Sequence, residues 1–271
     1  MRVWVDILTP KQCMLFSKLS ARLEEDGHDV LRTTREYREV TQLLRLKGID
    51  AKVVGRHGGG TLEGKLRASA ERSLQLTSLI KEWEPDVAVS FSSPEATRVA
   101  FGLGVPHVCV NDSPHAEAVA RLTVPLSKRL LTPKVIPKRA WVGFGISADR
   151  ITQYNALDAW AWLRDLKPDE SVLKRLGLDR SKPIITFRTE ETLAAYLLGK
   201  TPKESLIVPM VERLHKPSRD FQLVVVPRYE GQARVLKEVL GKKAIICESV
   251  IDGPSLLSFT SIFVGAGGTM T

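Results

Sequence analysis

The sequence predicts an α/β protein built from two doubly wound parallel domains, and three observations support that prediction. Apolar β-runs alternate with amphipathic helical stretches in both halves of the 271-residue chain. The alternation loosens over 123–165, which is rich in turns. The last residues join an apolar run to a glycine-rich turn and a threonine, the usual preface to a helix whose N-terminus binds phosphate. Such βαβα alternation calls for parallel sheets with helices on both faces.

The elements of the first half follow from periodicity and from their boundary residues. Residues 12–25 place Leu15, Phe16 and Leu19 on one face of an amphipathic helix. Short apolar runs bounded by turn residues predict the strands. The expected strands are 2–7, 30–33, 51–54, 86–91 and 107–110, and the expected helices are 12–25, 36–47, 63–83 and 94–103.

A linker is expected over 136–165, because the loosened segment contains Pro125, Pro133 and Pro137. The N-terminal domain then covers 1–135 and the C-terminal domain covers 166–271. Ligands of doubly wound sheets bind at the carboxyl ends of the strands, so functional residues are expected directly after strands, facing a cleft. The later strands are expected at 184–188, 221–227, 244–248 and 262–264, with helices at 203–214, 231–240 and 254–259.

Composition and charge narrow the class of protein. Hydrophobic residues make up 43% and charged residues 26%, as in ordinary globular proteins, and no apolar run approaches the ~20 residues of a membrane span. The start of the chain enters a strand directly, so we expect no signal peptide and a cytoplasmic location. The scattered Cys13, Cys109 and Cys247 are expected as reduced core residues, not as a metal cluster.

The net charge of +9 favours polyanionic partners, although a basic solvated surface explains it equally well. Nucleic acid is disfavoured, because Lys and Arg are spread along the chain without a recognisable binding motif. A nucleotide-sugar or an anionic lipid surface fits the charge, so peripheral membrane contact is retained as a hypothesis.

Three residues of the first half are candidates for chemistry. Asp6 ends the first strand, where a carboxylate can act as a base or orient a sugar hydroxyl; the alternative is a helix cap. His57 lies in the glycine-rich loop 55–61, which either meets an anion or is a flexible turn. His115 follows a buried strand beside carboxylates, as an acid/base unit or as a surface histidine near a capped turn.

The second half offers an anion site. Arg188 and Arg228 each follow a strand, where a guanidinium can fork onto a phosphate, although a single surface arginine is weak evidence. Gly267, Gly268 and Thr269 follow a third strand in a phosphate-binding type of turn. Together these residues predict a diphosphate site.

Several of these segments resemble the archaeal-rich domain-of-unknown-function 354 family. The resemblance rests on six segments: Val3-Trp4-Val5-Asp6-Ile7, Arg56-His57-Gly58-Gly59, Ser92-Ser93-Pro94-Glu95-Ala96, Asn111-Asp112-Ser113-Pro114-His115-Ala116, Pro227-Arg228-Tyr229 and Gly265-Ala266-Gly267-Gly268-Thr269-Met270. That family is similar to GT-B glycosyltransferases and UDP-N-acetylglucosamine 2-epimerases, which implies two Rossmann-like domains and a nucleotide-sugar ligand. Chains of the family continue past the last of these segments, so we expect the second domain to be incomplete here and the protein to be prone to self-association.

The resemblance implies a glycosyltransferase that uses a nucleotide-diphosphate sugar, expected to be a UDP-sugar, with an unspecified acceptor. Such chemistry needs no metal or other cofactor if arginines and helix N-termini neutralise the leaving diphosphate. Arg188, Arg228, Gly267, Gly268 and Thr269 are assigned to the diphosphate, and Asp6, His57 and His115 to catalysis. The alternatives are a non-hydrolysing 2-epimerase and a nucleotide-sugar binding protein without turnover.

Overall fold

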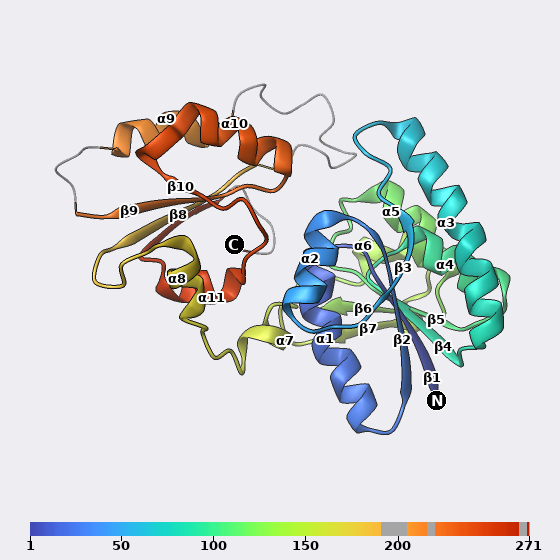
Figure 1. The fold of residues 1–271 in the computed structure, drawn as a ribbon. Coiled ribbons are helices and arrows are strands. Elements are labelled where there is room, and N and C mark those ends of the chain that lie inside the picture. Colours follow the sequence, from blue (N-terminus) through green and yellow to red (C-terminus); the bar gives the residue numbers. More distant parts are fainter. Residues whose placement is uncertain (191–204, 216–219, 266–269, 271) are drawn as a thin grey trace. The chain divides into compact units, whose positions relative to one another are not determined.

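The computed structural model describes residues 1–190, 205–215, 220–265 and 270, which form two α/β units (Figure 1). The first unit spans Met1–Arg164 and the second spans Asp165–Thr271. Each unit contains one sheet, and every neighbouring pair of its strands is parallel. The α/β fold with two parallel sheets that the sequence predicted is therefore confirmed.

The first sheet has seven strands in the order β3-β2-β1-β4-β5-β6-β7. The chain steps outward from β1 to β2 and β3, and then returns to place β4 on the other side of β1. The direction of winding therefore reverses between β1 and β4, which is where doubly wound sheets bind ligands. The strands are β1 (Arg2–Ile7), β2 (Asp29–Glu36), β3 (Lys52–Arg56), β4 (Val87–Ser90), β5 (His107–Val110), β6 (Arg129–Pro133) and β7 (Ile151–Tyr154).

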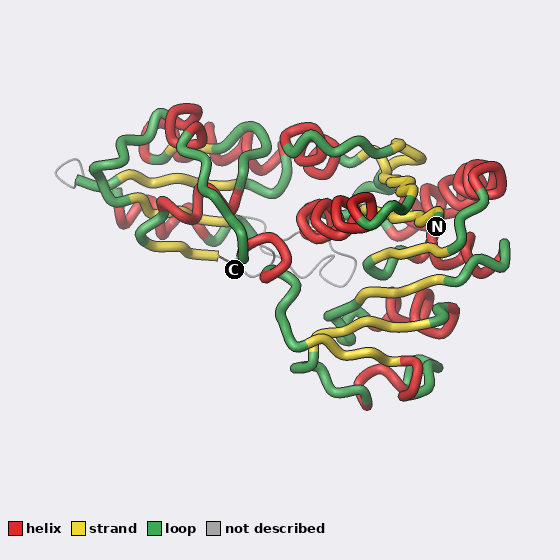
Figure 2. The backbone as a smooth tube through the Cα atoms, turned by 90° about the horizontal axis from the view of Figure 1, so that it is seen from below, coloured by secondary structure: helices red, strands yellow, loops and turns green. Residues whose placement is uncertain are grey.

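The helices of the first unit form two groups (Figure 2). Helix α1 packs beside α2 and α7, whereas α3 packs beside α4, and α4 beside α5. Trp4 of β1 and Ala88 of β4 face the second group, where they contact Leu76 and Val99 in one apolar cluster. The helices are α1 (Pro10–Glu25), α2 (Arg38–Leu46), α3 (Leu62–Trp83), α4 (Pro94–Gly102), α5 (Glu117–Thr123), α6 (Arg139–Val142) and α7 (Trp160–Leu163), with short 3-10 turns η1 (Val124–Leu126) and η2 (Ala148–Arg150).

The second unit has a four-stranded sheet in the order β10-β9-β8-β11. Side chains of β8 alternate between two apolar clusters, because successive residues of a strand point to opposite faces. Ile184 packs with α8 and α11, and Ile185 packs with α9 and α10. The elements are α8 (Ser171–Leu176), β8 (Ile184–Arg188), α9 (Ile207–Leu214), β9 (Gln222–Val226), α10 (Glu230–Leu240), η3 (Gly241–Lys243), β10 (Ile245–Ile246), α11 (Gly253–Phe259) and β11 (Ile262–Gly265).

The segment 136–165, expected as a linker, belongs almost entirely to the first unit. It supplies α6, η2, β7 and α7, and β7 pairs with β6 from Leu130–Ile151 to Pro133–Tyr154. The buried Trp141 and Ile151 pack in one cluster with Leu130. The division between the units falls at Arg164 and Asp165 instead of over a thirty-residue linker. The first unit thus has two more strands than the sequence pattern indicated.

The three cysteines are core residues. Cys13, Cys109 and Cys247 are buried with free thiols. Burial raises the pKa of Cys13 and of Cys247 to about 12, and raises the pKa of Cys109 as well. All three thiols therefore stay protonated at neutral pH, so they are poor nucleophiles and poor metal ligands.

The turn between β3 and α3 is held tightly against the start of the helix. Thr61 caps α3, and its Oγ1 accepts a hydrogen bond of 3.1 Å from the Gly64 N–H. A Cβ atom placed on Gly58 would lie 2.4 Å from Lys65 Cα and 2.5 Å from the Gly64 carbonyl oxygen. Backbone atoms cannot move aside as a flexible side chain can, so glycine is required at position 58.

We expect Gly58→Ala to destabilise the protein by ~1–3 kcal/mol, the usual cost of forcing an extra carbon into a packed site. Urea unfolding followed by circular dichroism measures this free energy. Gly143→Ala is the matched control, because no atom lies within 4 Å of a Cβ there and its φ of −61° suits alanine. Equal stabilities of the two variants would contradict the packing of this turn.

Candidate functional site

The carboxyl edge of the first sheet has unusual backbone geometry at its reversal point. Ser92, just after β4, has a φ of +52°, a left-handed conformation that non-glycine residues rarely adopt. Its Oγ is buried and donates to the Val110 carbonyl at 3.3 Å. The next residue, Ser93, caps α4 by accepting the Ala96 N–H at 3.2 Å. This turn brings the N-terminus of α4 to the carboxyl end of β4, and backbone strain of this kind concentrates at functional sites.

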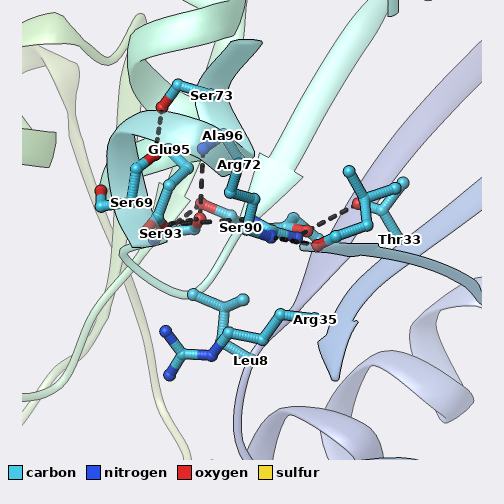
Figure 3. Close-up of polar contacts among 12 residues, drawn as sticks. Leu8, Thr33, Arg35, Ser69, Arg72, Ser73, Ser90, Ser93, Glu95 and Ala96 are labelled. Atoms are coloured by element: carbon cyan, nitrogen blue, oxygen red, sulfur yellow. Dashed lines mark hydrogen bonds and ion pairs between the residues drawn. The ribbon is translucent and has the colours of Figure 1, made fainter. Parts of the chain in front are cut away.

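Asp6 is wholly buried in an ion pair with Arg72 of α3. Figure 3 labels Arg72 and Thr33, two of its partners. Arg72 Nη1 donates to Asp6 Oδ2 at 3.0 Å, and Nη2 donates to Oδ1 at 2.6 Å. Thr33 Oγ1 donates to Oδ1 at 2.6 Å and accepts from the Trp4 indole at 2.8 Å. Both carboxylate oxygens are therefore occupied by protein donors.

The electrostatics of this pair make Asp6 a weak base. Burial alone would raise the pKa of Asp6, but the charge of Arg72 and hydrogen bonds from Arg72, Thr33 and Ser93 outweigh it. The pKa of Asp6 consequently lies below its ordinary value of 3.8. The sequence suggested Asp6 as a catalytic residue. In the structure its carboxylate is the counter-ion of the buried Arg72.

Space for Arg72 comes from a glycine in β3. A Cβ on Gly55 would lie 2.9 Å from the Cβ and Cγ of Arg72, and Gly55 has a φ of +71°. The guanidinium then reaches Val54, whose carbonyl accepts from Nε at 2.9 Å. Arg72 thus ties α3 to both β1 and β3, and all three of its guanidinium nitrogens have partners.

His57 lies in the turn after β3, stacked on Tyr37 with ring centroids 4.6 Å apart. Its Nδ1 accepts the Gly59 N–H at 3.1 Å. Burial, followed by the charges of Arg35 and Lys65, lowers the pKa of His57 from 6.5 to about 4. The neutral ring with an accepting Nδ1 carries its proton on Nε2. His57 therefore presents a hydrogen-bond donor at neutral pH, not a base.

His115 is an exposed residue of the turn after β5, two positions before α5. Glu117, two residues further along, begins α5 and accepts from Arg121 Nε at 3.0 Å. The exposed imidazole of His115 stays a candidate for proton transfer.

A second polar cluster, which the sequence did not single out, gathers at the ends of β4, β5 and β7. Lys11 in the first turn of α1 pairs with Asp112 and lies 2.5 Å from Asp158 Oδ2. Its ammonium also lies 4.3 Å from the centroid of the Phe91 ring. The Tyr154 hydroxyl donates to Asp158.

The charges of this Lys11 cluster hold Asp112 ionised. Burial opposes ionisation, but the hydrogen bond and charge of Lys11 lower the pKa of Asp112 below its ordinary value. Burial, with the hydrogen bond to Asp158, raises the pKa of Tyr154. Asp112 lies in the polar run after β5, and this run is a sequence signal from which the residue could have been identified. Nothing in the sequence marks the pairing of Lys11 with Asp158, because their partnership depends on tertiary contact across about 150 residues.

In the second unit, two predicted arginines are braced at the carboxyl ends of adjacent strands. Arg188 Nη1 donates to the carbonyls of Val226 and Pro227 at 3.2 and 2.7 Å. Arg228 Nε donates to the Thr189 carbonyl at 2.9 Å. Each arginine thus hydrogen-bonds the end of the other's strand, so both guanidinium groups lie at one edge of the sheet. Gly267, Gly268 and Thr269 lie outside the described residues.

A surface hollow of about 550 Å³ lies at the opposite, amino edge of the first sheet. Arg2, Asp29 and Glu82 contribute to its lining. Ligands of doubly wound sheets bind at the carboxyl edge, so we assign no function to this hollow. Within the described ranges, no helix is long and apolar enough to cross a membrane, and no group of three or more His, Cys, Asp or Glu is arranged to hold a metal ion.

The two units with parallel sheets have a GT-B-like fold, and comparison with known proteins gives the family of the chain. The chain belongs to the family described as protein of unknown function DUF354, whose model matches residues 1–271. An uncharacterised protein of Methanocaldococcus jannaschii is 33% identical over 273 residues, which cover 99% of this chain and 77% of that protein.

Solved structures share the fold at low sequence identity. A UDP-GlcNAc 2-epimerase from Neisseria meningitidis, bound to UDP-GlcNAc, matches with a TM-score of 0.74 at 16% identity, covering 99% of this chain and 78% of that one. The Methanocaldococcus jannaschii UDP-GlcNAc 2-epimerase, in complex with UDP-GlcNAc and UDP, gives 0.74 at 18%, with 99% and 79% covered. A Streptomyces glycosyltransferase complexed with thymidine diphosphate gives 0.58 at 14%, with 99% and 77% covered.

We expect Asp6→Asn to lower the free energy of unfolding at pH 7 by ~3–5 kcal/mol, because it leaves the buried Arg72 charge uncompensated. Urea unfolding measures the loss. Glu63→Gln is the matched control: its carboxylate pairs with Arg67 at 3.4 Å on an exposed surface, so its effect should stay within ~0.5 kcal/mol.

The same substitution has a pH signature. Because the pKa of Asp6 is lowered in the folded state, the unfolded chain takes up a proton first as the pH falls. The Asp6 contribution is fully present above about pH 4 and is lost below it. The stability gap between wild type and Asp6→Asn should therefore narrow below pH 4; a constant gap would contradict the pairing.

We expect the His57 ring to titrate near pH 4 in NMR spectra, because burial and positive neighbours disfavour its protonated form. Arg35→Gln should raise this pKa toward 6.5, since it removes one of the two positive charges that act on the ring. Arg56→Gln is the control, because that side chain is exposed and paired with Glu71. Equal shifts of the His57 pKa in the two variants would contradict the placement of Arg35 near the ring.

Proposed function

We propose that the protein binds a nucleotide-diphosphate sugar and transfers the sugar to an acceptor hydroxyl. The observation that carries this proposal is the cross-bracing of Arg188 and Arg228 at the carboxyl ends of β8 and β9. Two guanidinium groups at one sheet edge suit a diphosphate, since each can donate two parallel hydrogen bonds to phosphate oxygens. The similar folds that were solved with UDP-GlcNAc, UDP or thymidine diphosphate support the same class of ligand.

In this proposal the second unit holds the donor. Arg188 and Arg228 bind the diphosphate, and the backbone of Gly267, Gly268 and Thr269 completes its site. In the transfer step, the acceptor oxygen forms a bond to the anomeric carbon as the bond from that carbon to the diphosphate oxygen breaks. The nucleoside diphosphate leaves with the electron pair, and the two arginines stabilise its added negative charge.

The hydroxyl proton must leave during transfer, and the first unit supplies the candidates. His115 is the base in our proposal, because its imidazole is exposed beside the carboxyl edge of the first sheet. His57 donates a hydrogen bond from Nε2 to a bound oxygen, as its tautomer requires. Asp6 positions Arg72 and touches no substrate.

A 2-epimerase is the second candidate, because the epimerase structures match with TM-scores of up to 0.74 against 0.58 for the glycosyltransferase. Epimerisation at C2 must break a carbon–hydrogen bond, which needs a strong, well-placed base. The carboxylates of Asp6 and Asp112 both have lowered pKa values and paired oxygens. Neither carboxylate is therefore available as the strong base that removal of the C2 proton needs, which favours transfer.

NMR of UDP-GlcNAc with the protein in deuterated water separates these functions. An epimerase incorporates deuterium at C2, because inversion there exchanges the C2 proton with solvent. A transferase leaves C2 unlabelled and releases UDP in the presence of an acceptor. If the donor binds tightly but stays intact and unlabelled with every acceptor class offered, the protein binds nucleotide-sugar without turnover.

We expect Arg228→Ala to weaken UDP binding by ~1.5–3 kcal/mol, about ten- to hundredfold, the value of a charge-assisted hydrogen bond. Isothermal titration calorimetry measures the affinity, and uridine should bind both forms with similar weakness because it lacks the diphosphate. Arg180→Ala is the matched control, since Arg180 precedes β8 at the opposite edge and pairs with Glu170. Unchanged UDP affinity in Arg228→Ala would remove Arg228 from the donor site.

A further inference from the structure

Arg35 is a cation at the carboxyl edge of the first sheet that neither the sequence patterns nor the proposed function uses. It is the penultimate residue of β2, which lies between β1 and β3. Its Nε atom is buried and has no hydrogen-bond partner among the described residues. In Figure 3 its guanidinium extends away from the bonded cluster around Arg72, and no dashed line reaches it. Arg35 is therefore a half-buried cation whose buried Nε donor is unmatched.

The neighbouring carboxylates are already engaged with other groups. Charges that act on Arg35 include Glu95 and Asp6, which attract it, and Arg72, which repels it. Asp6 has both oxygens bonded to Arg72. Glu95 accepts from Ser93 Oγ at 3.3 Å and lies 3.9 Å from Arg72 Nη1. These groups offset the charge of Arg35 through space, but they leave its Nε–H without an acceptor.

An unmatched buried donor of a charged group destabilises the folded state, because no hydrogen bond offsets the loss of its hydration. Arginine cannot relieve this cost by losing its proton, because its pKa stays far above neutral even when lowered. Native structures rarely keep such a group without a purpose, and an absent ligand is one of the few explanations. The planar fork of a guanidinium matches the two oxygens of a carboxylate or a phosphate.

We propose that Arg35 and His57 form a subsite that binds a carboxylate or phosphate group of the acceptor. Arg35 supplies the charge and the fork, and His57 supplies the Nε2–H donor from the adjacent end of β3. Strand pairing brings the two residues close together: Glu36, next to Arg35, pairs with Arg56, next to His57, and the His57 N–H donates to the Glu36 carbonyl at 2.9 Å. This inference rests on the proposed function, since it specifies the chemistry of the acceptor.

The stability of an Arg35 variant distinguishes a purely structural role for this residue from a ligand-binding role. Replacement of a structural arginine, such as the fully bonded Arg72, should destabilise the protein. A ligand-binding arginine with an unmatched donor should leave stability unchanged or improve it on replacement, because binding residues are commonly kept at a cost in stability. The melting temperature of Arg35→Gln without ligand distinguishes the two roles.

The binding test uses inorganic phosphate and acetate as separate probes, with sodium chloride at matched ionic strength as the reference. The readouts are the His57 ring shifts in NMR spectra and the melting temperature. We expect phosphate, acetate or both to shift His57 in the wild type. Arg35→Gln should weaken that response about tenfold or more, the worth of one charge-assisted bond. Which probe acts identifies the acidic group as phosphate or carboxylate.

Arg56→Gln is the matched control, because it removes the same charge from an exposed residue that pairs with Glu71 at 3.6 Å. It should keep the wild-type response. The inference is overturned by a wild type whose His57 responds to neither anion, by an equal response in Arg35→Gln, or by an Arg35→Gln variant that is destabilised or unfolded. UDP calorimetry with wild type and Arg228→Ala tests the donor site separately, so failure of one proposal is distinguishable from failure of the other.

Discussion

The buried pair of Asp6 and Arg72 fixes the geometry on which the candidate site of the first unit depends. Asp6 stands at the carboxyl end of the central strand β1, and Arg72 belongs to α3, the helix that returns the chain from β3 to β4. With its third nitrogen bound to the Val54 carbonyl, Arg72 holds the ends of β1 and β3 to one helix. The turn that carries His57 therefore lies between two anchored points. Gly55 leaves room for the Arg72 side chain, and Gly58 leaves room for the backbone at the start of α3.

The sequence predicted most of the fold because local patterns decide it. The predicted strands at 2–7, 107–110 and 184–188 match β1, β5 and β8, and the long helix after Thr61 differs by one residue at its start. The two strands missed within 123–165 have a physical explanation. Pro133 ends β6, and β7 is four residues long, so the sequence pattern of both strands resembles that of a connection rich in turns. What makes them strands is pairing with β5 and with each other, together with burial of Trp141, and neither leaves a periodic signature.

The candidate site was predicted less well, because residue type and position do not reveal partners. Asp6 stands where a catalytic carboxylate would stand, yet a partner 66 residues away occupies both of its oxygens. His57 directly follows β3, as the sequence indicated, but its capacity to donate from Nε2 follows from one hydrogen bond from the Gly59 N–H, which fixes the tautomer. Lys11, Asp112 and Asp158 come together from three distant segments. The positions of Arg188 and Arg228 at one sheet edge were predictable, since they lie at the carboxyl ends of two strands that pair with each other.

Arg72 and Arg35 show how one residue type serves two purposes at the same edge of a sheet. Arg72 comes from a helix, points into the sheet and has a partner for each nitrogen, so its burial cost is offset within the protein. Arg35 comes from the strand next to β1 and keeps a buried Nε without a partner. The carboxylates that could have satisfied Arg35 are held by Arg72 and Ser93 instead. By engaging those acceptors, the structural arginine leaves the second arginine available for an acidic group from outside, so the stability of the edge and its capacity to bind an anion have the same origin.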